Sequence, residues 1–195
     1  MQATTLSFSN IHENGTLFSE LLRARHRTFI EQAQWDLPQA DGMEFDQYDT
    51  PASRWVAVHE YGRILAGVRL TPTTHRCGCY SYMIRDAQIG LLDTIPSNLL
   101  YGEAPVEPHV WESSRVFVCD DVPAKNRMRV QMQLIGEMVK SARELGATSV
   151  LGLIPANSPR LARRVGLDCQ QAGPVLDFGA FQSVCVNISM ATKMH

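Results

Sequence analysis

Three consecutive segments indicate the architecture of this chain. They read WESSRVFV over residues 111–118, MRVQMQLIGEMVKSAREL over 128–145 and TSVLGLI over 148–154. Apolar side chains recur at helical spacing in the middle segment and stop before Gly146, whereas the flanking segments are rich in strand-forming residues. This order predicts a mixed sheet with helices on its faces.

The rest of the chain extends this α/β pattern in both directions. Helical spacing predicts a helix over about 16–34 and a short basic helix over 159–165. Hairpin strands are predicted at 55–59 and 64–70, and a last strand at 183–190. Residues 38–53 predict a loop, and within the proline-rich stretch 72–108 only 89–92 suggests a helix. We expect one α/β domain over 1–195, a three-layer sandwich with a mixed central sheet.

Composition and charge narrow the class of protein. Of the 195 residues 45% are hydrophobic, and 18 lysines and arginines against 20 aspartates and glutamates give a net charge of −2. This balance predicts no general attraction to nucleic acid or to anionic lipid. No apolar run approaches the ~18 residues of a membrane span. Met1 to Gly15 lacks a secretory pattern, so a cytoplasmic protein is expected.

The five cysteines are expected to be reduced thiols with structural roles. Cys77-Gly78-Cys79 leaves a metal clip as the minor alternative. A zinc site normally needs a second pair or closely spaced histidines, and neither follows in the sequence. We therefore expect no metal site.

Three arginines stand inside otherwise apolar or strand-forming patterns. Arg25 interrupts the apolar stripe of the first helix, Arg69 lies in the second hairpin strand, and Arg115 lies in strand 111–118. A buried guanidinium needs a counter-charge, and the alternative is a side chain that reaches solvent. Strict alternation places Arg115 on the face opposite Glu112 and Ser114, unless a bulge turns it.

Carboxylates that could pair with these arginines lie in two places. Asp46 and Asp49 are three residues apart in the predicted loop, among aromatic residues, and Glu112 lies in the strand. An acidic loop is otherwise a solvated turn. The three arginines and three carboxylates sum to zero charge, and such a cluster suits a partly dry cleft that binds a zwitterionic ligand.

The combined spacing resembles one enzyme family. The shared elements are Arg25, Phe29, Trp35-Asp36, Glu44 to Asp49, Arg69-Leu70 with Pro72-Thr73-Thr74, and Trp111-Glu112 with Ser114-Arg115. Over residues 20–166 this set is similar to the acyl-homoserine-lactone synthases, the LuxI-type autoinducer synthases of bacterial quorum sensing. The resemblance implies a fold like that of the GNAT acetyltransferases. It also implies transfer of an acyl group from a thioester to the amine of S-adenosylmethionine, then lactone closure with release of 5′-methylthioadenosine.

The resemblance implies roles for particular residues. Glu112 would be the general base, acting with Ser114, which would orient the thioester, and with Arg115. The S-adenosylmethionine pocket would comprise Arg25, Phe29, Trp35, Asp46, Asp49 and Arg69, and the acyl pocket would include Met83, Gln88 and Gly152. Both small molecules are substrates, so no cofactor is expected.

Two positions depart from the family pattern. Gln88 stands near the place where many members carry an aromatic residue, so one wall of the family's pocket differs. Gly152 stands where related synthases that use 3-oxo acyl chains carry a threonine. The lost hydroxyl and the added volume predict an unsubstituted, bulky or long acyl group.

The acyl carrier is expected to be acyl carrier protein, with a coenzyme A thioester as the alternative. Arg160, Arg163 and Arg164 form a basic patch that suits the acidic carrier protein or the phosphates of coenzyme A. A solvated basic face is the simpler interpretation. No glycine-rich phosphate loop precedes the long helix, where Lys125, Asn126 and Arg127 stand, and this favours the carrier protein.

Two rival functions remain open at this stage. One is an N-acyltransferase of the same fold with another amine acceptor, against which Phe29, Trp35, Asp46 and Asp49 argue. The other is a catalytically silent protein that binds S-adenosylmethionine or acyl chains, against which Glu112 argues.

Overall fold

The computed structural model describes residues 1–164, 166–179 and 181–191, without the side chains of residues 161 and 164. The chain divides into two compact units, each assembled from two segments. The first unit comprises 1–70 and 115–141, and the second comprises 71–114 and the chain from 142 onward. The unit boundaries fall inside β5 (Arg63–Pro72), β6 (Val110–Val118) and α3 (Ala124–Glu144), so these elements belong to both units.

Seven strands form one sheet in the order β1-β4-β5-β6-β7-β9-β8. Besides β5 and β6, the strands are β1 (Gln2–Leu6), β4 (Arg54–Glu60), β7 (Ser149–Pro155), β8 (Cys169–Asp177) and β9 (Gln182–Ser189). β6 and β7 pair in parallel, whereas β1-β4, β4-β5, β7-β9 and β8-β9 are antiparallel. The mixed sheet predicted from the sequence is therefore confirmed.

The helices and a small second sheet complete the description. The helices are the 3-10 turn Ile11–Glu13, α1 (Leu17–Arg25), the π-helical segment η2 (His26–Gln32), α2 (Met83–Gln88), α3 and α4 (Ser158–Arg164). β2 (Gln39–Ala40) and β3 (Met43–Glu44) form a separate two-stranded sheet. No helix within the described residues is long and apolar enough to cross a membrane.

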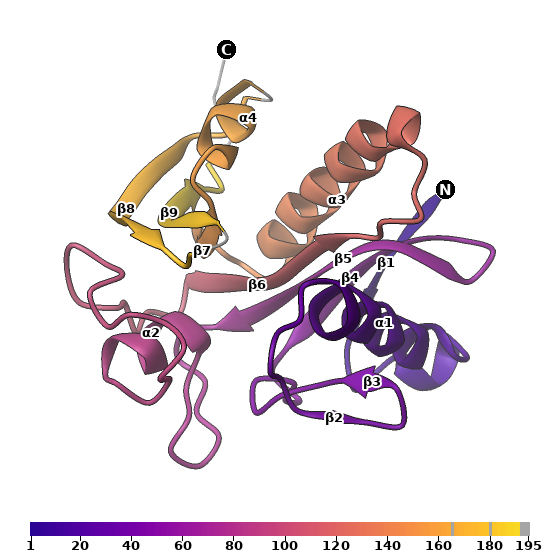
Figure 1. Ribbon diagram of the computed structural model, residues 1–195, viewed down its shortest axis with the longest axis horizontal. Helices are drawn as coiled ribbons and strands as arrows, with labels where there is room; N and C mark the ends of the chain where they lie inside the picture. Colours follow the sequence, from indigo (N-terminus) through magenta and orange to yellow (C-terminus); the bar gives the residue numbers. More distant parts are fainter. Residues whose placement is uncertain (165, 180, 192–195) are drawn as a thin grey trace. The chain divides into compact units, whose positions relative to one another are not determined.

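In the first unit, α1 and α3 cover the sheet. Figure 1 shows them on opposite faces of β4 and β5. α1 comes close to β5 at Gly67, where an added Cβ would lie 2.7 Å from Leu21 Cδ1 and 2.8 Å from Phe117 Cε1. Both side chains are buried. A glycine at this position therefore lets α1, and Arg25 at its end, lie directly on the strand.

In the second unit, α2 and the segment that follows it pack on the strands. Tyr82 is fully buried before α2, and its hydroxyl donates to Pro105 O at 2.6 Å. Residues 99–101 lie against β8, because Tyr101 N donates to Ala172 O at 2.9 Å. A Cβ at Gly173 would lie 1.9 Å from Leu99 O, so only glycine permits this approach.

Several predicted elements differ from the structure. The helix predicted over 16–34 is α1 followed by η2, in which Ala33 N donates to Thr28 O. Residues 38–53 contain β2 and β3 and are not a continuous loop. The helix suggested at 89–92 is wrong: α2 precedes it and ends at Gln88. Gly90, two residues further on, has a φ of +79°, a conformation typical of the residue after a helix end.

The sequence analysis missed the two edge strands, β1 and β8. β1 reads QATTL, which is too short and too polar for an alternating pattern to stand out. β8 reads CQQAGPVLD and contains Gly173 and Pro174, which normally mark a break. Its pairing with β9 shifts register between Gln171 and Val175, and an edge strand tolerates such an irregularity.

Candidate functional site

Arg25 lies at the end of α1 and is the first of three buried arginines in the first unit. Its Nε donates to Glu44 Oε2 at 2.6 Å, and its Nη1 and Nη2 donate to the two oxygens of Asp49 at 2.7 and 2.9 Å. Only 1% of Arg25 is exposed. The predicted counter-charge is therefore present, and the alternative of a solvated side chain is wrong.

Arg69, in β5, continues the same network. Its Nη1 donates to Asp46 Oδ1 at 2.5 Å and lies 3.1 Å from Asp49 Oδ1. The guanidinium carbon lies 5.5 Å from the centre of the Tyr48 ring, within the range of a cation–π contact. Asp49 is thus shared by two arginines.

Arg115, in β6, closes the network. Its Nη2 lies 3.2 Å from Glu44 Oε1 and 2.8 Å from Asp46 Oδ2. We call the six residues the ion cluster: Arg25, Arg69, Arg115, Glu44, Asp46 and Asp49. It is neutral, as expected, but its third carboxylate is Glu44 and not Glu112. Glu44 lies two residues before Asp46 and reads as one more acid of the same predicted loop, so the sequence offered no reason to prefer it.

The backbone of β6 explains how Arg115 reaches the cluster. Arg115 has a φ of +53°, which is rare for a residue other than glycine. Thr73 N donates to Val110 O and Cys119 N to Leu65 O, so β5 and β6 run in opposite directions. From Val110 to Cys119 β6 advances nine residues, while β5 spans eight between Thr73 and Leu65. One extra residue in β6 is the mark of a β-bulge. Of the two possibilities for Arg115, strict alternation or a bulge that turns its side chain, the structure has the bulge.

A tight turn after β3 positions the aspartates. Asp46 N donates to Asp49 Oδ2 at 2.9 Å, and Tyr48 N donates to Asp46 Oδ1 at 2.9 Å. Trp55 Nε1 adds a bond to Asp49 Oδ1 at 2.8 Å. The carboxylates are thus held by backbone and indole donors as well as by the arginines.

The ionisation of the cluster follows from this pairing. Burial alone would raise the pKa of Asp46 and Asp49. For both, the arginines outweigh burial, Arg69 most strongly, so each pKa lies below its ordinary value. Burial likewise acts to lower the pKa of Arg25, but the charge and hydrogen bonds of Asp49 outweigh it and raise that pKa. Arg25, Asp46 and Asp49 therefore stabilise one another in their charged forms.

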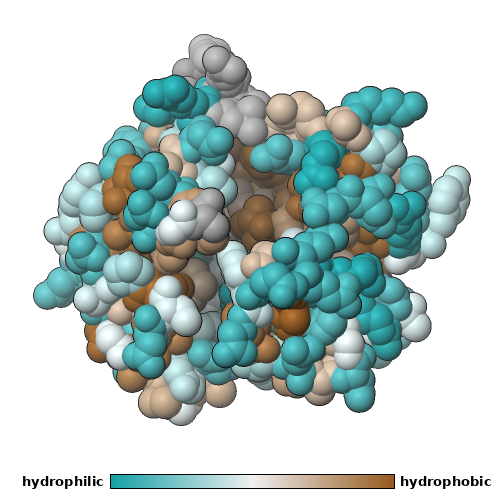
Figure 2. All heavy atoms as spheres, in the orientation of Figure 1, coloured by the Kyte–Doolittle hydropathy of each residue, from teal (hydrophilic) through white to brown (hydrophobic). Residues whose placement is uncertain are grey.

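An aromatic pair borders the cluster. The rings of Phe29, in η2, and Trp35 stack with centroids 5.2 Å apart at an angle of 18°. Arg115 lies over the Phe29 ring, 5.6 Å from its centre. Trp35 is 37% exposed, whereas Phe29 is buried. Figure 2 shows mainly hydrophilic side chains over the part of the first unit that contains α1, β2 and β3.

Glu112, in the second unit, is held differently. It is fully buried in β6, and its carboxylate accepts bonds from Ile84 N at 2.7 Å and Met83 N at 3.3 Å, at the start of α2. Burial and the charge of Glu112 raise the pKa of Tyr82, and the same two causes raise the pKa of Cys185 to about 12. Ser114 is also buried in β6. These two backbone amides fix the orientation of the Glu112 carboxylate.

The three residues predicted to form the acyl pocket all lie in the second unit. Met83 is buried beside Glu112. Gln88 Nε2 donates to Gly102 O and its Oε1 accepts from Ala104 N, both at 2.7 Å, so this amide fastens the loop to α2. Gly152 opens less volume than predicted: Ser113 Oγ lies 2.6 Å from where a Cβ would stand. The Ser113 hydroxyl, from β6, therefore occupies space that a side chain at position 152 of β7 would fill.

The predicted basic patch lies on α4. Arg160 and Arg163 are exposed, and Arg163 Nε donates to Pro159 O at 3.3 Å. The side chain of Arg164 lies outside the described residues.

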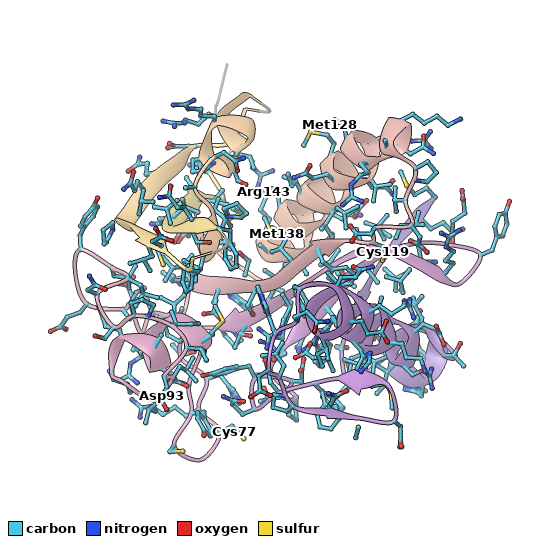
Figure 3. The ribbon with its side chains drawn as sticks, in the orientation of Figure 1. Cys77, Asp93, Cys119, Met128, Met138 and Arg143 are labelled. Atoms are coloured by element: carbon cyan, nitrogen blue, oxygen red, sulfur yellow. The ribbon has the colours of Figure 1, made fainter. Side chains whose placement is uncertain are left out.

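All five cysteines are free thiols. Figure 3 shows Cys77 on the loop between β5 and α2, and Cys119 at the end of β6. Burial raises the pKa of Cys119 to about 11. The described residues contain no group of histidine, cysteine or acidic side chains that could hold a metal ion.

Comparison with known proteins identifies the family. The autoinducer synthase model matches residues 9–190, so the chain belongs to that family. An acyl-homoserine-lactone synthase of Ralstonia solanacearum is 32% identical over 165 residues, covering 82% of this chain and 75% of the relative. TofI, whose crystal structure was determined in a ternary complex with an inhibitor and MTA, shares 28% sequence identity with this chain. The two structures superpose with a TM-score of 0.74 over 97% of this chain and 92% of TofI. BjaI, a CoA-dependent synthase solved with SAM and isopentyl-CoA, shares the fold at 21% identity, with a TM-score of 0.77 over 97% of this chain and 83% of BjaI.

Proposed function

We propose that this chain is an acyl-homoserine-lactone synthase that makes a quorum-sensing signal. It transfers an acyl group from a thioester carrier to the amine of S-adenosylmethionine, and the carboxylate of that product then displaces 5′-methylthioadenosine to close the lactone. Membership of the autoinducer synthase family carries this proposal. The neutral, buried ion cluster supports it, because S-adenosylmethionine carries an ammonium, a sulfonium and a carboxylate.

The ion cluster and the aromatic pair are proposed to form the S-adenosylmethionine pocket. The cross-paired arginines and carboxylates satisfy one another, so their part is to hold the pocket in one shape. Phe29 and Trp35 offer stacked ring faces to the adenosyl group and the sulfonium. Arg115, expected among the catalytic residues, is here a positioning residue, because its guanidinium pairs with Glu44 and Asp46.

Glu112 is proposed as the general base. The ammonium of S-adenosylmethionine gives one proton to the carboxylate, directly or through a water, and becomes a neutral amine. The amine nitrogen then bonds to the acyl carbon, the carbon–sulfur bond breaks, and the carrier thiolate leaves with the electron pair. The new amide nitrogen loses its extra proton, which the thiolate takes up to become the free thiol. Backbone bonds from α2 fix the carboxylate, and Ser114 on the same strand would orient the thioester.

Release of 5′-methylthioadenosine tests the proposed function. The purified chain is incubated with S-adenosylmethionine and a panel of acyl carrier protein and coenzyme A thioesters. Release that requires an acyl thioester supports the synthase. Acylation of another amine without this release supports a different N-acyltransferase, and binding without turnover supports a silent binding protein.

We propose acyl carrier protein as the acyl donor. Exposed Arg160 and Arg163 on α4 offer positive charge to its acidic surface. In the first turn of α3, Arg127 Nη1 donates to Cys119 O at 3.3 Å and Asp120 Oδ1 at 3.2 Å. That arginine is therefore occupied, and the acidic loop beside it is unfavourable for the phosphates of coenzyme A. The fold does not decide the donor, because BjaI shares it and is CoA-dependent.

Charge reversal separates the two donors. The double variant Arg160→Glu with Arg163→Glu should lower kcat/KM for the acyl carrier protein thioester by about tenfold or more, with little change for the same acyl group on coenzyme A. Arg129→Glu, at an exposed position of α3, is the matched control. Equal activity of the double variant with the carrier protein, or a wild-type preference for coenzyme A, would contradict this donor.

We also propose that the reaction takes place in the cytoplasm. Five free thiols in the structure suit a reducing compartment.

A further inference from the structure

Thr71, in β5, carries a hydroxyl that the fold does not use. The residue has no exposed surface, and its Oγ1 is buried without a hydrogen-bond partner among the described residues. A buried polar group left unsatisfied costs about 1–3 kcal/mol. A valine has nearly the same shape and would avoid this cost, so the hydroxyl calls for a role outside folding.

Thr73, the residue directly after β5, shows what a threonine hydroxyl with a structural role does here. It is also buried, and its hydroxyl donates toward Glu107 O and Val110 O, both at 2.9 Å. It also accepts a bond from Glu107 N at 3.1 Å. The Thr73 hydroxyl therefore fastens the segment before β6, and nothing comparable engages the Thr71 hydroxyl.

The sheet register places Thr71 beside Glu112. β5 and β6 are neighbouring antiparallel strands, and Thr73 N donates to Val110 O. Two residues back along β5 and two forward along β6, Thr71 stands opposite Glu112. Side chains at opposite positions of antiparallel strands share a face, with Cβ atoms about 4.5–5.5 Å apart. The unused hydroxyl and the proposed base therefore lie on the same face of the second unit.

We infer that Thr71 is a positioning residue for the amine of S-adenosylmethionine. This inference rests on the proposed function. Thr71 Oγ1 accepts one N–H of the ammonium while Glu112 accepts another, and the proton passes to the carboxylate. The neutral amine keeps its N–H bond to Thr71, and its freed lone pair is held in a fixed direction for attack on the acyl carbon. A hydroxyl suits this position because it accepts a bond without competing for the proton.

The test compares Thr71→Val with Thr71→Ser and Thr73→Val. Calorimetric titration with S-adenosylmethionine should show about tenfold weaker binding by Thr71→Val, and KM should rise for this substrate with little change for the acyl thioester. Thr71→Ser, which keeps the hydroxyl, should restore both values. The Tm of Thr71→Val should equal or exceed that of the wild type, whereas Thr73→Val should have a lower Tm.

Two results would overturn the inference. One is wild-type affinity and kinetics in Thr71→Val. The other is a loss that affects both substrates alike and accompanies a lower Tm, which is the signature of a packing role. Failure of the proposed function is a separate observation, because the wild-type chain would then release no 5′-methylthioadenosine with any acyl thioester.

Discussion

The ion cluster of the first unit and Glu112 of the second unit both place carboxylates away from solvent. They differ in the partners that offset the free energy of desolvating the charge. In the cluster, Asp49 accepts bonds from Arg25, Trp55 and the backbone of Asp46, so its oxygens are heavily engaged. Glu112 has no exposed surface, and it accepts hydrogen bonds from the backbone amides of Met83 and Ile84.

This difference distinguishes carboxylates that hold the structure together from the carboxylate proposed to take part in the reaction. Carboxylates locked between guanidinium groups have lowered pKa values and are poor proton acceptors. They shape a pocket but do not suit a base. The backbone amides of Met83 and Ile84 hold the carboxylate of Glu112 in one orientation. We therefore assign the binding surface to the cluster and the proton transfer to Glu112.

The strongest test of this assignment is Glu112→Gln. The amide cannot take the proton, so kcat should fall by about 10²–10⁴-fold, while S-adenosylmethionine still binds within a fewfold of the wild type. Glu103→Gln, at an exposed position, is the control and should be unaffected. Normal turnover by Glu112→Gln would remove the contrast between the two sites.

Arg25→Ala tests the structural side of the comparison. It leaves Glu44 and Asp49 buried with one cation fewer, so the free energy of unfolding should fall by about 3–5 kcal/mol. Denaturant unfolding measures the loss. Arg25→Lys keeps the charge but not the forked geometry and should lose less. An Arg25→Ala protein of wild-type stability would show that the cluster does not support the fold.

The contrast also explains what could be predicted from sequence. Arg25, Arg69, Asp46 and Asp49 were predicted as partners because each charge breaks an apolar or strand pattern or lies in a turn, and they are found together. Glu44 was missed as the third carboxylate, because local pattern does not reveal which acid of a loop points inward.

Contacts set by the long-range register of the sheet were the second feature that could not be predicted from the sequence. Ser113 Oγ fills space beside Gly152 because β6 and β7 place these residues opposite one another. Gln88 fastens a loop, a contact between residues 14 and 16 positions apart in the chain. Neither contact leaves a trace in composition or periodicity, so neither could be predicted from the sequence.

Acid should weaken the first unit through Asp46 and Asp49. Their folded pKa values are lowered, because the arginines outweigh the opposing effect of burial. The stability they contribute is thus present above the unfolded value of about 4 and is lost as the pH falls below it. Urea unfolding between pH 7 and pH 3 should show a stable plateau and then a decline. A stability independent of pH across this range would contradict the pairing.

The smallest effect is expected for substitution of Arg23, which lies on the same helix as Arg25. Because the Arg23 side chain is partly exposed, it is a direct control for the effect of burial. Arg23 Nη1 lies 2.9 Å from Glu20 Oε1, a separation similar to those in the cluster, but the two side chains are 41% and 39% exposed. Water already solvates both charges and the pair orders two flexible chains, so Arg23→Ala should cost only about 0.2–1 kcal/mol. If Arg23→Ala cost as much as Arg25→Ala in the same unfolding assay, loss of helix propensity or packing would explain both, and burial of charge would not be the reason that the cluster matters.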